Sequence, residues 1–231
     1  TDVKEFQMKM YGTLYPTHYK FKYPKAGEDN SLISIRIFDT QYDRHFIFDI
    51  GNNPDIYIPR IMWSKRKDEL IVFKMNRLQN KLELLSGTFS MDTPNNIGIK
   101  TKPIYTEKCS TYIDIHDNTS FINENEFIWT SEKDGYNHIY LINYTNGTEK
   151  QLTHGDWDVT EIYGYTSRSK KIFFQAAKSH PTKREIYALH TKNNKIELLT
   201  EKSGTNEANF SKTFNYFINT HSSADTPFEI T

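Results

Sequence analysis

The chain has 231 residues, of which 36% are hydrophobic, 14% aromatic and 25% charged. The aromatic content excludes a disordered chain, which would lack the apolar surface needed to offset chain entropy. Lys plus Arg and Asp plus Glu number 29 each, so the formal charge is zero and the basic excess typical of nucleic-acid-binding domains is missing.

The two ends of the chain suggest a fragment of a longer protein. Residues 1–6 contain neither a start methionine nor a signal peptide, and residues 227–231 end inside a predicted strand. No apolar run approaches the ~20 residues of a membrane-spanning helix. The single cysteine, Cys109, cannot form an intrachain disulfide, and we expect an inert buried thiol rather than a nucleophile.

Short alternating segments in the N-terminal half predict strands, because alternation is the pattern of a half-buried sheet. The predicted strands here are residues 34–38, 46–50, 70–73 and 82–85, with turns at 39–44 and 77–81. No segment carries an apolar helical stripe over three turns. The sequence therefore predicts an all-β fold.

The strand segments recur with a period near 45 residues. Segments beginning at Phe127, Ile139 and Gln151 are followed by similar segments 45, 47 and 47 residues later. The copies begin at Leu70, Phe127, Ile172 and Tyr216. We interpret residues 91–105, which lengthen the first interval, as a loop insertion.

A repeat of this length with about four strands is typical of a β-propeller blade. The chain would then supply about four to five four-stranded blades, which is a partial propeller. A β-sandwich with evenly spaced strands is the alternative.

Motifs of common catalytic and cofactor sites are missing from the sequence. It contains no Gly-x-Ser-x-Gly nucleophile elbow, no phosphate-binding Gly-x-x-x-x-Gly-Lys loop and no His-Glu-x-x-His zinc motif. We therefore predict no catalytic residue, metal site or cofactor in this chain. Glycines such as Gly135 and Gly147 lie at predicted hairpin turns.

Two polar clusters stand out. In residues 112–117 the alternation predicts a strand with Asp114 and His116 on one face, where they would either bind a cation or substrate or simply order a strand end. In residues 154–159, Asp156 and Asp158 flank Trp157, and we favour a turn between blades with the indole as a packed anchor. The charged hairpin at residues 131–138 would form ion pairs with a neighbouring blade.

Several motifs resemble the N-terminal domain of the dipeptidyl peptidase IV family, which belongs to the prolyl oligopeptidase group of serine peptidases. The longest is Trp-Thr-Ser-Glu-Lys-Asp-Gly-Tyr-Asn-His-Ile-Tyr-Leu at residues 129–141. The others are Tyr-Pro at 15–16, Tyr-Pro-Lys-Ala-Gly-Glu at 23–28, Ile-Asp-Ile-His-Asp at 113–117, Gly-Asp-Trp-Asp-Val at 155–159 and Ser-Ser-Ala-Asp-Thr-Pro at 222–227. They occur in the family's order and cover nearly the whole chain. The chain resembles a bacterial member of the family.

The resemblance implies an eight-bladed propeller, with residues 1–231 as part of it, packed on a C-terminal α/β-hydrolase domain that carries a Ser-Asp-His triad. Such enzymes release N-terminal dipeptides with Pro or Ala second, and a glutamate pair upstream of this chain holds the peptide's amine. Asp114, His116 and Asp117 would then line the substrate channel. A periplasmic, cell-envelope or secreted location and a homodimer are also implied, with dimer contacts at Tyr15, Pro16, Tyr23, Pro24 and Lys25.

The leading hypothesis is a propeller that shapes and gates the substrate chamber of a dipeptidyl exopeptidase and is inactive alone. One alternative is a non-enzymatic propeller that binds protein or glycan partners. Another is a propeller glycosidase with carboxylates on the inner strands, which is disfavoured because those positions read as mainly apolar or Tyr.

Overall fold

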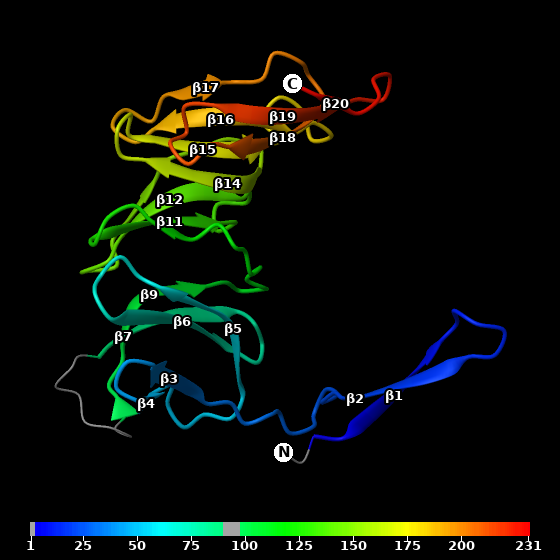
Figure 1. The fold of residues 1–231 in the computed structure, drawn as a ribbon, viewed down its shortest axis with the longest axis vertical. Coiled ribbons are helices and arrows are strands. Elements are labelled where there is room, and N and C mark those ends of the chain that lie inside the picture. The colour runs from blue at the N-terminus through cyan, green and yellow to red at the C-terminus, as the bar shows by residue number, and fades with distance from the viewer. Residues whose placement is uncertain (1–2, 90–97) are drawn as a thin grey trace. The chain divides into compact units, whose positions relative to one another are not determined.

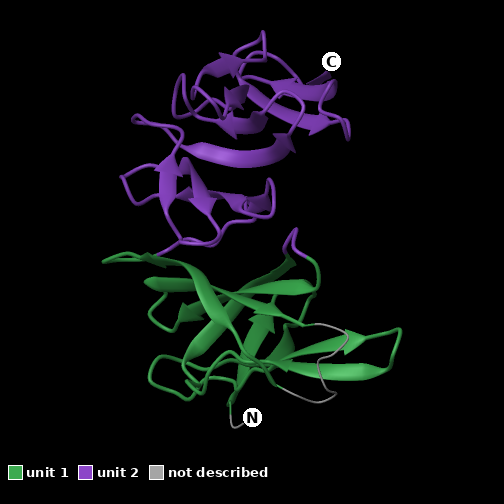
Figure 2. Cartoon of the chain, turned by 90° about the vertical axis from the view of Figure 1, so that its left-hand side faces the viewer, with its two compact units in different colours: residues 1–63, 67–112 green, residues 64–66, 113–231 purple. Residues whose placement is uncertain are grey.

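The computed structural model describes residues 3–89 and 98–231, and within these ranges every regular element is a strand (Figure 1). The prediction of an all-β fold is confirmed. No helix in the described ranges is long and apolar enough to cross a membrane. The chain divides into unit 1, residues 1–63 and 67–112, and unit 2, residues 64–66 and 113–231 (Figure 2).

Unit 1 begins with a two-stranded hairpin that we call the arm. Its strands β1 (Glu5–Met10) and β2 (Thr17–Lys22) pair antiparallel from Glu5↔Lys22 to Met10↔Thr17. Most of its side chains are exposed, since a single hairpin has no second layer to bury them. In Figure 1 the arm extends away from β3 and the sheets that follow it in unit 1.

The next sheet combines neighbouring strands with one from much later in the chain. The antiparallel pair β3 (Ile35–Asp39) and β4 (Arg44–Phe48) matches the two predicted strands. The third strand, β8 (Gly98–Ile99), pairs parallel with β4 through Ile47↔Gly98 and Phe48↔Ile99. The Arg44–Asp39 ion pair closes the turn between β3 and β4.

The second sheet of unit 1 has four strands in the order β5-β6-β7-β9. Their bounds are β5 (Ile56–Trp63), β6 (Glu69–Asn76), β7 (Lys81–Thr88) and β9 (Lys102–Lys108). The interpretation of residues 91–105 as a loop was therefore wrong at 98–99 and from 102 onward, where the chain is paired. Of the remaining positions, residues 91–97 lie outside the described residues and residues 100–101 belong to no strand. The unit 1 core is apolar, with Phe46, Phe48 and Val72 among its fully buried members.

Unit 2 contains three further antiparallel sheets. The first has the order β10-β11-β12-β13, the second β14-β15-β16-β17 and the third β18-β19-β20. The strands are β10 (Ser120–Phe121), β11 (Glu126–Ser131), β12 (His138–Asn143), β13 (Glu149–Gln151), β14 (Val159–Thr166), β15 (Lys171–Ala176), β16 (Glu185–His190), β17 (Ile196–Leu198), β18 (Thr205–Phe210), β19 (Phe217–Ser222) and β20 (Glu229–Ile230).

The sequence period corresponds to the sheet period. Leu70 lies on β6, Phe127 on β11 and Ile172 on β15, and each of these strands is second in its sheet. The segment beginning at Tyr216 becomes β19, again a second strand. Ile128, Ile139, Ile172 and Phe174, all fully buried, belong to the core between the first two sheets of unit 2.

Candidate functional site

The arm presents apolar side chains to solvent. At its tip, Leu14 is 92% exposed and Tyr15 79% exposed, with Tyr11 also largely exposed. Isolated exposed apolar residues need no explanation, but a group of them on one hairpin is typical of an interaction site.

The base of the arm is held to the rest of unit 1. The Lys25 amide donates to Glu28 Oε2 at 3.1 Å, and Lys4 Nζ pairs with Glu28 Oε1 at 2.7 Å. The Lys4 ammonium holds the pKa of the Glu28 carboxyl below its usual range. Arg77 then donates from Nη2 to the Glu28 carbonyl oxygen at 2.5 Å and from Nη1 to Asp55 at 3.0 Å. The base of the arm is thus anchored, whereas the apolar side chains of its tip are exposed.

The proposed dimer residues are distributed over both parts of the arm. Tyr15 and Pro16 are exposed near the tip, whereas Pro24 is half-buried at the base. The Tyr23 ring lies 6.3 Å from the Phe6 ring, and Lys25 Nζ lies 5.0 Å from the centre of the Phe6 ring.

Residues 112–117 do not form the predicted strand. They run as an extended connection without ladder pairing between β9 and β10. The side chains of Asp114 and Asp117 are exposed, and that of His116 is half-buried. The His116 ring packs edge-on against Trp129 at 4.5 Å, and its Nδ1 accepts a hydrogen bond from the Asn118 amide.

Asn118 explains why this connection is ordered without a ladder. Its Nδ2 donates to Thr130 Oγ1 at 3.2 Å, and its Oδ1 accepts from the Ile162 amide at 3.0 Å. One amide side chain therefore joins the connection to β11 and β14. Asp114 is exposed and follows the buried Ile113.

The turn at residues 154–159 is structural, as predicted. Trp157 is buried, and the fully buried His138 ring contacts it edge-on at 5.0 Å. His138 Nε2 lies 2.8 Å from the Gly155 carbonyl oxygen and its Nδ1 lies 3.0 Å from Thr153 Oγ1. Because a carbonyl only accepts, Nε2 carries the proton. Asp158 accepts from the Asn137 amide at 2.8 Å.

The charged hairpin at residues 131–138 has an ion pair within its own sheet, and Asn137 joins it to the next sheet through hydrogen bonds with Asp158 and Val159. Lys133 pairs with Glu149 on β13, and Asp134 accepts from Gln151 on the same strand.

Sequence reasoning missed two carboxylates on the first strands of successive sheets. Glu161 lies on β14 and Glu207 on β18. Burial, and then the negative charge of Glu207, raise the pKa of Glu161. Between them Tyr163 accepts from the Ala208 amide at 3.2 Å, and burial raises its pKa. These two carboxylates are exceptions to the expectation that the inner strands are mainly apolar or Tyr.

Cys109 is partly exposed rather than buried, which corrects the expectation from sequence. Its Sγ lies 3.3 Å from Thr111 Oγ1, and this hydrogen bond lowers the pKa of the thiol. Across residues 3–89 and 98–231, no group of three or more His, Cys, Asp or Glu side chains is arranged to hold a metal ion.

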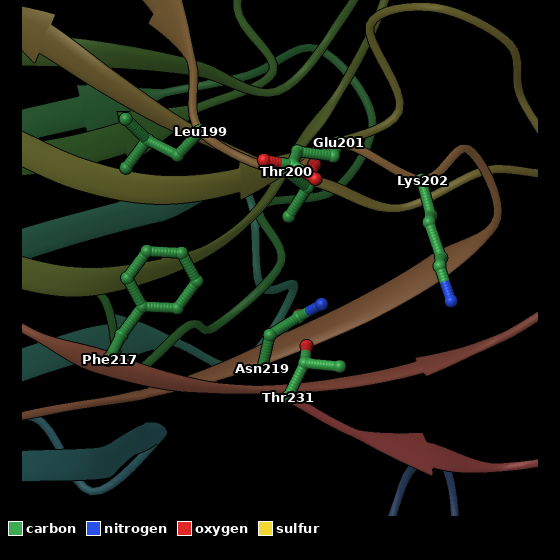
Figure 3. A pocket seen from close by; sticks show the side chains of 7 residues that line it. All are labelled: Leu199, Thr200, Glu201, Lys202, Phe217, Asn219 and Thr231. Atoms are coloured by element: carbon green, nitrogen blue, oxygen red, sulfur yellow. The ribbon is translucent and has the colours of Figure 1, made fainter.

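A cavity of about 310 Å³ lies beside the third sheet of unit 2. Phe217, Asn219 and Thr231 line one side and residues 199–202 line the other (Figure 3). Asn219 Nδ2 donates to Asn206 Oδ1 at 3.0 Å, and Lys202 pairs with Glu229. The Lys202 ammonium and Asn219 Nδ2 are thus engaged in structural contacts, whereas Glu201 is exposed at the rim.

Comparison with known proteins identifies the architecture. A solved structure of dipeptidyl peptidase 4 from Porphyromonas gingivalis superimposes with a TM-score of 0.84 and 35% identity, over 99% of this chain and 32% of that chain. The sheets therefore form part of a β-propeller, and the sandwich alternative is excluded.

The family model described as the dipeptidyl peptidase IV N-terminal region matches residues 1–228. The chain therefore belongs to the dipeptidyl peptidase IV family, as a piece of its N-terminal region. A relative named "Probable dipeptidyl-aminopeptidase B" from Aspergillus oryzae is 26% identical, and "Dipeptidyl peptidase 4" from Arthroderma otae is 23% identical. The alignments cover 93% of this chain but only 25% and 28% of those proteins.

Proposed function

We propose that this chain forms part of the substrate-chamber wall of a serine exopeptidase that removes X-Pro and X-Ala dipeptides from peptide N-termini. The family match over residues 1–228 carries this proposal. The nucleophile, general base and triad aspartate would belong to a C-terminal α/β-hydrolase domain outside residues 1–231, and the isolated chain would have no activity.

The test of the parent activity is turnover of an X-Pro chromogenic substrate by the full-length protein and by residues 1–231 alone. We expect turnover by the first and none by the second. Activity of the isolated chain would contradict the assignment of catalysis to another domain. Absence of activity in a folded full-length protein would instead favour a propeller that binds protein or glycan partners.

Within the chamber, we assign substrate contact to Asp114, His116 and Asp117. Asp114 is exposed between the buried Ile113 and Asn118, whose side chain joins this connection to β11 and β14. An exposed carboxylate can hold a peptide amine or amide N–H through a charge-assisted hydrogen bond.

The test compares kcat/KM of the full-length enzyme for a tripeptide and a longer peptide. We expect the double substitution Asp114→Ala with His116→Ala to lower kcat/KM by about tenfold, which corresponds to roughly 1.4 kcal/mol. Asp225→Asn, a change at another exposed carboxylate of unit 2, serves as the control. An unchanged kcat/KM in the double variant would remove these residues from the channel.

We also propose that the arm contacts a second copy of the protein. The exposed tip and anchored base support this, since a rigid apolar projection loses little entropy when it docks. Replacing residues 6–21 by Asn-Gly retains the Glu5↔Lys22 pair and a two-residue hairpin. We expect the full-length variant to sediment as a monomer, and a dimer would contradict the proposal.

A further inference from the structure

Cations gather on three turns of unit 2. The turns are residues 166–171 between β14 and β15, 190–197 between β16 and β17, and 211–216 between β18 and β19. They carry six cations, namely Arg168, Lys170, Lys171, Lys192, Lys195 and Lys212, and the single carboxylate Glu197. We call these three turns the basic end. Such a concentration is unexpected in a chain with no net charge.

The three turns lie at one end of their sheets. The Thr191 amide and hydroxyl both donate to the Lys170 carbonyl oxygen, at 3.0 and 3.1 Å, which ties the first two turns together. In the third turn, the Phe214 ring stacks on Phe173 of β15 at 5.2 Å. The ladder of β14 and β15 ends close by, at Thr166↔Lys171.

The one carboxylate is already compensated. Glu197 lies 2.8 Å from Lys171 Nζ, 3.6 Å from Lys195 Nζ and 3.5 Å from His190 Nε2. The hydrogen bond from Lys171 lowers the pKa of Glu197, so this carboxylate remains ionised near neutral pH. Arg168, Lys170, Lys192 and Lys212 are exposed, and none of them has an ion-pair partner in the part of the chain that the structure describes.

We propose that the basic end docks on the anionic headgroup surface of a lipid bilayer. Clusters of four or more Lys and Arg side chains are attracted to anionic lipids over about one Debye length. Here the cations project from separate turns on long flexible side chains, which suits a laterally mobile array of phosphates. Tyr216, 78% exposed on the third turn, is the residue type that favours the headgroup region.

A nucleic acid fits this surface less well. Single strands are bound by several exposed aromatic side chains beside a basic groove. On the three turns Tyr216 is exposed, whereas Phe214 is stacked against Phe173. Specific duplex binding usually accompanies a basic domain, and this chain is neutral.

The test is co-sedimentation of the full-length protein with vesicles. Phosphatidylcholine vesicles with and without 30% phosphatidylglycerol are compared at about 0.05 and 0.5 M NaCl, because exposed charges are screened over a few ångströms at high salt. The triple variant Arg168→Gln, Lys170→Gln, Lys192→Gln is compared with Lys100→Gln, Lys108→Gln, Lys150→Gln, which removes three exposed cations elsewhere.

We expect binding only to the anionic vesicles, loss of that binding at high salt, and at least a tenfold weaker affinity in the first variant but not in the control. The charge-conserving variant Arg168→Lys, Lys170→Arg, Lys192→Arg should retain binding. It tests the proposal if the Gln variant does not fold. The inference is overturned by equal binding to neutral vesicles, by equal loss in both Gln variants, by displacement with 10 mM inorganic phosphate at constant ionic strength, or by binding to duplex DNA without binding to vesicles.

Discussion

His138 Nε2 donates its proton to the carbonyl oxygen of Gly155, 2.8 Å away and 17 residues later in the chain. The same imidazole packs against Trp157 and reaches Thr153 through its other nitrogen. This arrangement gives the Asp-Gly-Tyr-Asn-His and Gly-Asp-Trp-Asp motifs a common structural role, because each supplies half of one buried hydrogen-bonded turn.

Gly155→Ala should destabilise this turn more than a conformational effect alone would. Gly155 has φ +118°, and a Cβ there would lie 2.7 Å from Trp157 Nε1. We expect the free energy of local unfolding to fall by at least about 2 kcal/mol, because a strained backbone costs about 1–3 kcal/mol and the indole must also move. Hydrogen exchange of the β12 and β14 amides measures it. Gly135→Ala has φ +106° with open space around the new Cβ, and an equal effect there would contradict the role given to Trp157.

Asn206→Ala should weaken the junction between the last two sheets of unit 2. Asn206 is fully buried. Its Nδ2 donates to the carbonyl oxygens of Arg184 and Lys202, each at 3.1 Å, and its Oδ1 accepts from Asn219. Unsatisfied buried acceptors cost 1–3 kcal/mol each, so we expect a loss of about 2–4 kcal/mol in the exchange-derived stability of β18. The exposed turn residue Asn215, changed to Ala, should cost less than about 0.5 kcal/mol.

Arg77→Lys should loosen the base of the arm while leaving its net charge unchanged. A lysine ammonium cannot reproduce the planar fork that binds the Glu28 and Lys25 carbonyls together with Asp55. We expect amide exchange in residues 23–30 to become about tenfold faster, consistent with hydrogen bonds to charged groups worth 1.5–3 kcal/mol. Unchanged exchange would show that the arm is held by its aromatic contacts instead.

Glu161→Gln should stabilise the protein at neutral pH. Folding raises the pKa of Glu161. The stability that this carboxyl contributes is therefore fully present below the unfolded pKa and is lost as the pH rises through the folded pKa. The carboxylate is largely solvated, so the gain at pH 7 should be only a few tenths of a kcal/mol. Thermal midpoints of both proteins should converge near pH 4. A lower midpoint for Glu161→Gln at pH 7 would contradict the sign, and the exposed Glu201→Gln is the control.

Strand positions were the most predictable part of this structure. The alternation at residues 34–38 and the recurrence of Phe127 at Ile172 locate β3, β11 and β15 because the buried face of a pleated strand repeats every second residue. The role of Trp157 could also be predicted, because a large aromatic side chain near a turn glycine is usually buried in the adjacent core.

What could not be predicted depends on partners distant in sequence. Residues 112–117 alternate like a strand, yet Asn118 supplies their order through β11 and β14. Glu161 and Glu207 interact across successive sheets, which no local pattern reveals. The charged residues at 131–138 do not indicate by themselves that Lys133 pairs with Glu149 of the same sheet.

The parallel strand β8 has a consequence for synthesis of the protein. The β3–β4 hairpin can close early, but the outer edge of β4 pairs only when Gly98 and Ile99 arrive, about fifty residues later. At 5–20 residues per second, a ribosome leaves that edge exposed for several seconds. An unpaired strand edge is a template for pairing with other chains. The nascent protein is therefore vulnerable to aggregation during this interval.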